Sequence, residues 1–167
     1  GHQGRTREQA MSLVTLESAK LHLRVDSSDE DALIAVYITA AEQSAVSLLD
    51  RGVYADGTAL GVAKAAAPGE LDTAIAAYES AIAAAEALAD ETAKAASIQT
   101  AGNGLLRAKV AHRHAMDGMV VNEAIKAAVL LIVGSLYAQR EDVVVGVSVA
   151  KLPNGAEWLL APYKVYA

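Results

Sequence analysis

The spacing of apolar residues along the chain predicts a mostly helical protein. Between about residues 30 and 50, apolar positions recur at intervals of three and four, which is the period of a helix that buries one face. Residues 127–134 are apolar on every side, which predicts a central, buried helix over about 123–140. The apolar face of the earlier helix consists of Ile34, Ile38, Ala41, Ala45 and Leu48.

Polar residues mark the places where three helices begin. Thr15 precedes a short helical segment, LESAKLHL, and Asn122 precedes the central apolar segment. Each of these two side chains can accept a hydrogen bond from a backbone N–H of the first turn. Ser27 and Glu30 have the spacing of a capping box, so the helix that ends near residue 50 is expected to start just after Ser27.

The middle of the chain, residues 55–121, predicts a loop followed by a helical hairpin. Residues 55–69 contain a proline and three glycines, which is typical of a loop. An alanine-rich helix is expected over about 70–97, a turn at AGNG (101–104) and a return helix over about 105–116. The bulky face of the first arm consists of Leu71, Ile75, Tyr78, Ile82, Ala85 and Ala89.

The two arms of this hairpin carry opposite charges. Opposite charges on adjacent arms would favour their pairing. The alternative is two solvated faces, because exposed ion pairs are individually weak. The acidic residues of the first arm are Glu70, Asp72, Glu79, Glu86, Asp90 and Glu91, and the basic residues of the second are Arg107, Lys109 and Arg113.

The C-terminal part of the chain differs from the rest. Its valine run, residues 143–149, is rich in β-branched residues and predicts a strand or extended arm. Nothing else in the chain resembles a strand, so another copy could supply the partner by edge addition. The last segment, LPNGAEWLLAPYKVY, is apolar and aromatic between Pro153 and Pro162. Chain ends fray unless they are held, so this segment is expected to be buried in its own core or against a neighbouring subunit.

Composition narrows the classes of function. The net charge of −6 and the lack of a basic stripe disfavour direct binding to nucleic acid. The chain has no cysteine, which excludes disulfides, thiol catalysis and cysteine-ligated metals. The longest apolar run, 127–134, is too short to span a bilayer. Residues 1–10 lack the apolar stretch of a signal peptide and begin with Gly-His, so we expect a tag remnant or disordered N-terminus there and a single domain over 11–167.

No segment carries a specific signature of catalysis. The glycines and the lysine within 57–64 fail the spacing of a phosphate-binding loop. His112 and His114 are two residues apart, so a helix would point them to different faces. The acidic residues 29–31 are typical partners of a helix dipole, and Ser135 has no histidine near it in the sequence. Because no nucleophile, base and orienting group can be assembled, we predict a non-enzyme with no cofactor and no bound metal.

Four segments follow one another in a characteristic order, and in that order they resemble the head–tail connector (adaptor) family of long-tailed phages and prophages. The resemblance covers about 15–54 and 122–166. Residues 55–121 are longer than the usual connection between the two long helices of that family, which makes the hairpin an insertion. The segments are TLESAKLHLRVDSSDEDALI, AAEQSAVSLLDR, AIKAAVLLIVGSLYAQREDVVVG and LPNGAEWLLAPYKVY.

The resemblance implies a small all-α helical bundle with a helical hairpin insertion and a short extended or β arm near the C-terminus. It implies a structural virion protein of the head–tail junction, made in the bacterial host cytoplasm. Such a subunit would form a homo-oligomeric ring under the portal protein and bind a tail-completion or stopper protein. DNA would pass through the channel without sequence-specific binding, and no membrane would be involved. A separate hypothesis, which the resemblance does not imply, is that the acidic first arm faces the channel and repels the DNA.

We expect the contacts with other subunits or with the portal to come from the valine run and the terminal segment. A monomeric helical assembly or interaction module of a phage or prophage is an alternative, which the oligomeric state would distinguish. A second alternative is a small enzyme whose metal is held by His112, His114 and Asp117. The candidate contact residues are Val143, Val144, Val145, Val147, Val149, Leu152, Pro153, Trp158, Leu159, Pro162 and Tyr163.

Overall fold

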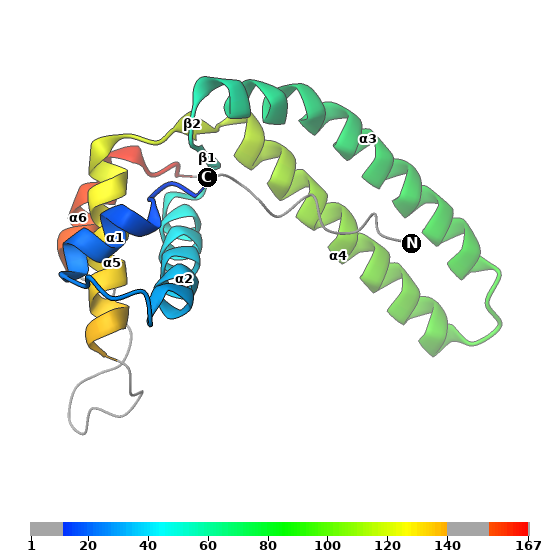
Figure 1. Ribbon diagram of the computed structural model, residues 1–167. Coiled ribbons are helices and arrows are strands. Elements are labelled where there is room, and N and C mark those ends of the chain that lie inside the picture. The colour runs from blue at the N-terminus through cyan, green and yellow to red at the C-terminus, as the bar shows by residue number, and fades with distance from the viewer. Residues whose placement is uncertain (1–11, 140–153, 167) are drawn as a thin grey trace. The chain divides into compact units, whose positions relative to one another are not determined.

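The computed structural model describes residues 12–139 and 154–166, and the fold of these residues is all-α (Figure 1). They form helices joined by short connections, together with one pair of two-residue strands. In chain order the elements are α1 (Leu16–Leu23), α2 (Asp31–Leu49), β1 (Val53–Tyr54), α3 (Gly57–Glu86), α4 (Glu91–Met116), β2 (Met119–Val120), α5 (Glu123–Ala138), α6 (Asn154–Leu160) and the 3₁₀ helix η1 (Ala161–Tyr163).

The chain divides into two compact units. The first, called here the core unit, contains the residues up to 57 and those from 119 onward, and the second, the hairpin unit, is 58–118. The bounds of the hairpin unit lie close to the 55–121 set apart by the sequence. That this segment is an insertion relative to related chains stays a prediction.

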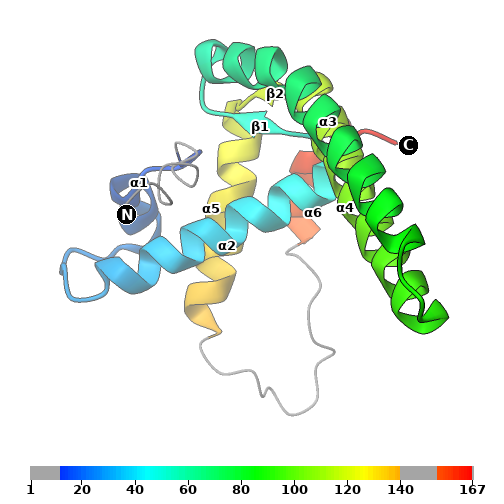
Figure 2. The ribbon, with the colours of Figure 1, turned by 90° about the vertical axis from the view of Figure 1, so that its right-hand side faces the viewer.

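The core unit is built around α2 and α5, which cross each other, as Figure 2 shows. Helices α1 and α6 pack against this pair. The predicted central helix is confirmed, because five residues of α5 are buried. The predicted buried face of α2 is confirmed except at its end, where Leu49 is buried and Leu48 is half-buried. The largest fully buried side chains are Ile34, Leu49, Ile125, Val129, Val133 and Leu160.

Two of the three predicted helix starts are confirmed. The Ser18 N–H donates to Thr15 Oγ1 at 3.1 Å, and the Ile125 N–H donates to Asn122 Oδ1 at 3.0 Å. The capping box at Ser27 is wrong. Its hydroxyl oxygen accepts from the Asp29 N–H at 3.1 Å within a turn, so α2 begins only at Asp31.

One carboxylate, that of Glu42 on α2, binds the segment 12–14 that precedes α1. Glu42 Oε1 accepts from the backbone N–H groups of Leu13 at 2.6 Å and Val14 at 3.1 Å, and from Ser12 Oγ at 2.6 Å. Both Leu13 and Val14 are buried. The carboxylate of α2 therefore satisfies two backbone donors that the buried segment would otherwise leave without partners.

The loop expected over 55–69 is wrong, because α3 begins at Gly57 and runs through Pro68. The segment is rich in alanine, the strongest helix former, and this outweighs the breakers. A proline inside a helix removes one backbone hydrogen bond and kinks the helix. The bend of α3 in Figure 1 agrees with this effect.

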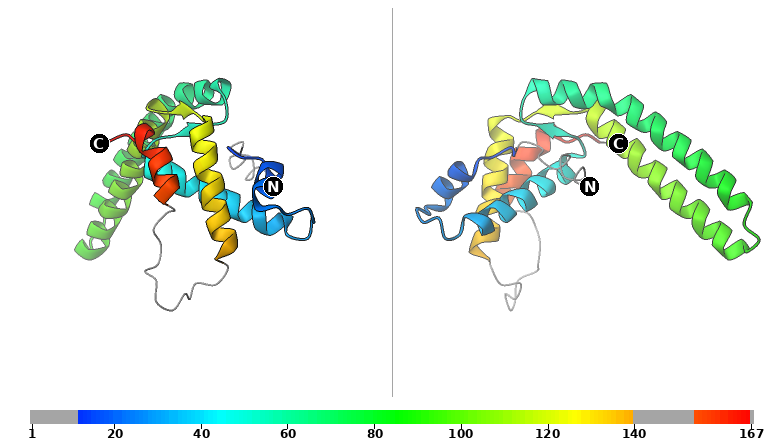
Figure 3. Two further views of the ribbon diagram at one scale, coloured as in Figure 1. Left: turned by 90° about the vertical axis from the view of Figure 1, so that its left-hand side faces the viewer. Right: turned by 45° about the vertical axis from the view of Figure 1, so that its right-hand side comes forward.

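The turn expected at 101–104 is also wrong, because α4 runs unbroken through both glycines. The hairpin turns earlier, between Glu86 and Glu91. There Asp90 caps α4 by accepting from the Thr92 N–H at 3.0 Å. The two helices of the hairpin run antiparallel (Figures 1 and 3). The predicted inner face of the first arm is half-buried over Leu71, Ile75, Tyr78 and Ile82 and buried at Ala85, whereas Ala89 is exposed beyond the helix end.

A parallel pair of short strands, which the sequence did not predict, belongs to the core unit. β1 and β2 pair with Val53 opposite Met119 and Tyr54 opposite Val120. The Met119 N–H donates to the Gly52 carbonyl at 3.0 Å, and the Val121 N–H donates to the Tyr54 carbonyl at 2.8 Å. These bonds join the chain just before the hairpin to the chain just after it. The predicted strand over 143–149 lies outside the described residues.

Within the part of the chain that the structure describes, α2 is the one helix whose length and composition would allow it to cross a membrane. Core helices of globular proteins meet the same criterion. Here the buried face of α2 packs against α1, α5 and α6.

Candidate interaction surface

The terminal segment folds back onto the core unit through one face of α6. Ala156 and Leu160 are both fully buried, and they are four residues apart, so they lie on the same side of the helix. Leu159 and Tyr163 are partly buried against the same core. The helix packs mainly on α5 and also touches α2. Part of the aromatic, apolar terminus therefore closes the core of its own chain.

The chain beyond α6 is also held, at the C-terminal end of α2. The Val165 N–H donates to the Leu49 carbonyl at 2.9 Å, and Arg51 Nη1 donates to the Tyr163 carbonyl at 3.4 Å. Asp50 ends α2 in the left-handed conformation, with φ 52°. A carbonyl in the last turn of a helix lacks a partner within the helix. Here the backbone N–H of Val165 supplies that partner for the Leu49 carbonyl.

The other side of the terminal segment faces solvent. Trp158 is 77% exposed and Tyr166 is 79% exposed, and Pro162 is also exposed. The Lys164 ammonium lies 5.5 Å from the centre of the Tyr166 ring, a favourable cation–π distance. We call Trp158, Pro162 and Tyr166 the terminal surface. The chain has one tryptophan, and it lies there rather than in the core.

The predicted contact residues thus divide by position. Of the four that the structure describes, Trp158 and Pro162 are exposed, whereas Leu159 and Tyr163 are turned partly into the core. Neither the exposed ring of Tyr166 nor the buried anchor Leu160 was among the residues predicted from the sequence. The four-residue spacing of Ala156 and Leu160 was the available signal for the anchor. The other predicted contacts lie outside the described residues: Val143, Val144, Val145, Val147, Val149, Leu152 and Pro153.

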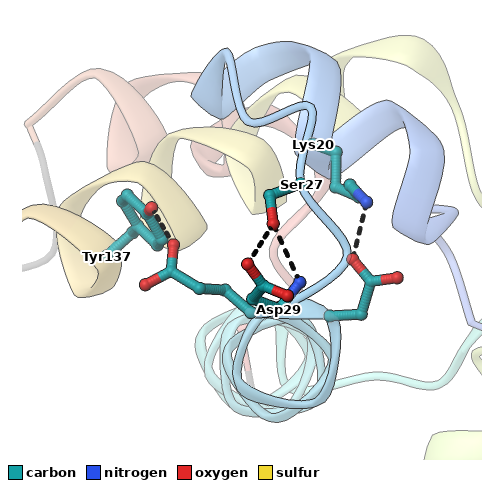
Figure 4. A network of polar contacts seen from close by, with 6 residues as sticks. Lys20, Ser27, Asp29 and Tyr137 are labelled. Carbon is teal, nitrogen blue, oxygen red and sulfur yellow. Dashed lines mark hydrogen bonds and ion pairs between the residues drawn. The ribbon is translucent and has the colours of Figure 1, made fainter.

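The acidic residues at the start of α2 hold structural contacts (Figure 4). Lys20 Nζ of α1 forms an ion pair with Asp31 Oδ1 at 2.6 Å. Ser27 Oγ donates to Asp29 Oδ2 at 2.6 Å. The Tyr137 hydroxyl of α5 donates to Glu30 Oε2. The carboxylates of Asp31 and Glu30 therefore tie α2 to α1 and to α5.

Two further groups of sequence candidates lie on α3 and α4. Gly57, Gly61 and Lys64 belong to α3 and so form a helix rather than a phosphate-binding loop. His112 and His114 lie near the end of α4, where both are half-buried. In residues 12–139 and 154–166, no three histidine, cysteine or acidic side chains are grouped so as to hold a metal ion.

Comparison with known proteins gives one family. A family model described as "Phage gp6-like head-tail connector protein" matches residues 13–103, more than half of the chain. The match runs from before α1 into α4, whereas the two C-terminal segments of the resemblance lie beyond it. No curated protein and no solved structure matches the chain. The family consists of structural virion proteins. The chain therefore belongs to the phage gp6-like head–tail connector proteins.

Proposed function

We propose that this protein is a ring-forming connector subunit, seated under the portal, that bridges the capsid to the tail around the DNA channel. The family supports a place at the head–tail junction. The observation that carries the finer proposal is Trp158, which is 77% exposed on a helix whose opposite face is fully buried. Tryptophan is enriched at the energetic centre of protein interfaces, and its exposure in a single chain leaves it free for a partner.

The anchoring of α6 suits it to such a contact. Leu160 and Ala156 hold the helix on α5, and the bond from Val165 to Leu49 holds the residues after it. A contact surface on a fixed helix loses less conformational entropy on binding than one on a mobile tail. We infer that Trp158 and Pro162 contact a neighbouring subunit or the portal. The valine run over 143–149, with Leu152 and Pro153, stays a second predicted contact.

The experiment measures assembly of the full chain, alone and with purified portal protein. Light scattering on a sizing column gives the mass, and negative-stain images show any ring. In assemblies of this chain alone, Trp158 is the only tryptophan, so its fluorescence emission reports its own burial without a label. We expect a ring and a shift of the emission to shorter wavelength as the ring forms.

The matched variants are Trp158→Ala and Leu21→Ala. Leu21 is 83% exposed on α1, so its removal controls for the loss of any exposed apolar side chain. We expect Trp158→Ala to abolish the ring and Leu21→Ala to leave it intact. A chain that stays monomeric with and without portal would overturn the proposal and favour a monomeric assembly module. A ring that forms with unchanged Trp158 emission would remove this side chain from the contact.

A further inference from the structure

The hairpin unit buries little of its own apolar surface. The apolar side chains that it buries belong to alanines, namely Ala67, Ala85 and Ala115. The bulkier side chains between its two helices, such as Leu71 and Ile82, are only half-buried. A helix hydrophobic along one stripe must bury that stripe against another element, and a two-helix layer leaves much of each helix uncovered.

One such uncovered stripe runs along α4. Ile98, Leu106 and Val110 are separated by multiples of four residues, so they lie along one side of the helix. All three are exposed, Leu106 by 61%. Gly102 continues the row between Ile98 and Leu106, and a Cβ placed on it would meet nothing within 4 Å. A glycine in this position lets a second helix approach closely.

The charges of the hairpin are segregated by helix. Helix α3 carries four carboxylates and one lysine, and α4 carries four cations and one glutamate. On α3, Asp72, Glu79 and Glu86 are spaced by seven residues and form one exposed row. On α4, Arg107 and Lys109 are exposed. In the part of the chain that the structure describes, these five side chains form no ion pair, so the solvated-face alternative holds for them.

We propose that the apolar stripe of α4 is an interface between copies of this chain, and that its occupant is α3 of a second copy's hairpin. Charge complementarity selects this occupant. Packing α4 on α4 would bring Arg107 and Lys109 of both copies together, and packing α3 on α3 would oppose two acidic rows. Only α3 on α4 places opposite charges across the interface, and like charges across an interface are strongly disfavoured.

The surfaces also fit in size. Much of the exposed side of α3 is alanine, such as Ala76 and Ala83, so the larger Leu106 and Val110 can lie against small residues. At about 1.5 Å per residue, the 13 residues from Ile98 to Val110 give an apolar contact row about 20 Å long. The apolar contact would supply most of the affinity, because exposed ion pairs are individually weak. The charges would set which helices meet.

This interface is separate from the terminal surface and is tested in a Trp158→Ala background, where association through that surface is removed. One variant reverses the acidic row with Asp72→Lys, Glu79→Lys and Glu86→Lys, and the other carries Arg107→Glu and Lys109→Glu. Sedimentation equilibrium at low ionic strength measures self-association, and circular dichroism checks that both variants stay helical. We expect each reversal to weaken association by at least about tenfold, and an equimolar mixture to restore it.

Salt and cysteine cross-linking give two further tests. At about 1 M salt the Debye length falls to about 3 Å, so the wild-type and mixed associations should weaken toward those of the single variants. The chain has no cysteine, which makes introduced thiols unambiguous. Chains with Ala76→Cys should cross-link to chains with Leu106→Cys through a short bis-maleimide. Chains with Ala111→Cys, also exposed on α4 but away from the stripe, should not.

Several outcomes would overturn the proposal. A Trp158→Ala chain that is monomeric at all concentrations would show that the hairpin does not self-associate. Reversals that leave association unchanged would fit an acidic arm that faces the DNA channel instead. Association that is lost in each variant but not restored on mixing would show that the two reversed rows do not face each other. Cross-links that form only between two Leu106→Cys chains would show that α4 packs on α4 instead of on α3. The ring contact assigned to Trp158 is tested separately, by comparing the Trp158→Ala and Leu21→Ala variants in the presence of the hairpin's native charges.

Discussion

The terminal helix allows a sharp prediction, because a small buried residue and a large exposed one lie two positions apart. Leu160 is fully buried, whereas Trp158 is 77% exposed. The perturbations are Leu160→Ala and Trp158→Ala, each measured on the isolated chain. We expect removal of the smaller side chain to destabilise the core unit more than removal of the larger one.

The expected magnitudes follow from burial. Replacing a fully buried leucine by alanine costs about 2–5 kcal/mol, because it removes apolar contacts and leaves a cavity. An aromatic side chain that is fully buried removes about 200 Å² from water. With 77% of Trp158 exposed, about a quarter of that area is buried, which at about 25 cal/mol per Å² is about 1 kcal/mol. We therefore expect the leucine substitution to cost about three times as much.

The assay is urea unfolding followed by circular dichroism at a concentration where the chain is monomeric. Neither substitution lies in the hairpin unit, so a separate transition of that unit would serve as an internal control. Thermal unfolding should show the same order, since about 1 kcal/mol shifts the midpoint of a chain of this size by about 2–4 °C. Equal losses for the two variants would refute the reasoning. They would show that Trp158 is packed in the core of the monomer. Its side chain would then not be exposed on the terminal surface for contact with a partner.

Three other substitutions test separate parts of the fold. Glu42→Gln should lower the free energy of unfolding by about 1–3 kcal/mol and speed hydrogen exchange at Leu13 and Val14. The reason is that a neutral amide oxygen replaces the carboxylate oxygen that accepts from both N–H groups, and it accepts more weakly. Unchanged exchange at those two amides would contradict the role assigned to Glu42. Gly104→Ala should stabilise the hairpin by about 0.5–1 kcal/mol, since a Cβ at Gly104 meets nothing within 4 Å and alanine is the better helix former, and a lower melting temperature would argue that α4 is broken there. Tyr137→Phe should cost about 0.5–1.5 kcal/mol through loss of the bond to Glu30, and a double-mutant cycle with Glu30→Gln should show coupling between the two; strictly additive effects would mean that the bond does not form in solution.

The sequence alone determined the helices that carry a strong pattern or a side-chain cap. The three- and four-residue spacing from Ile34 onward placed the buried face of α2, and the run that is apolar all round placed α5 at the centre. Thr15 and Asn122 marked helix starts because capping is a local interaction between a side chain and the next few backbone N–H groups. The family resemblance also followed from sequence order, and the family match confirms it.

The bounds of the hairpin became clear only from the structure, because its helix-breaking residues compete with many weak helix-favouring ones. Proline and glycine usually break helices, so Pro68, Gly102 and Gly104 predicted a loop and a turn. The surrounding alanines and the cap at Asp90 outweighed them, and α3 and α4 run through these positions. Intrinsic propensity is a weak local preference, and the sum over a long segment can override one or two unfavourable residues.

The direction in which each terminal side chain points was likewise a tertiary matter. The sequence showed an apolar, aromatic segment that had to be held, but two kinds of partner could hold it. Burial of Leu160 against α5 and the bond from Val165 to Leu49 turn one side of α6 inward, and this leaves Trp158 outside. The short strand pair escaped sequence analysis for a similar reason. Two residues carry no readable period, and β1 and β2 meet only because the chain leaves and re-enters the core unit at neighbouring points.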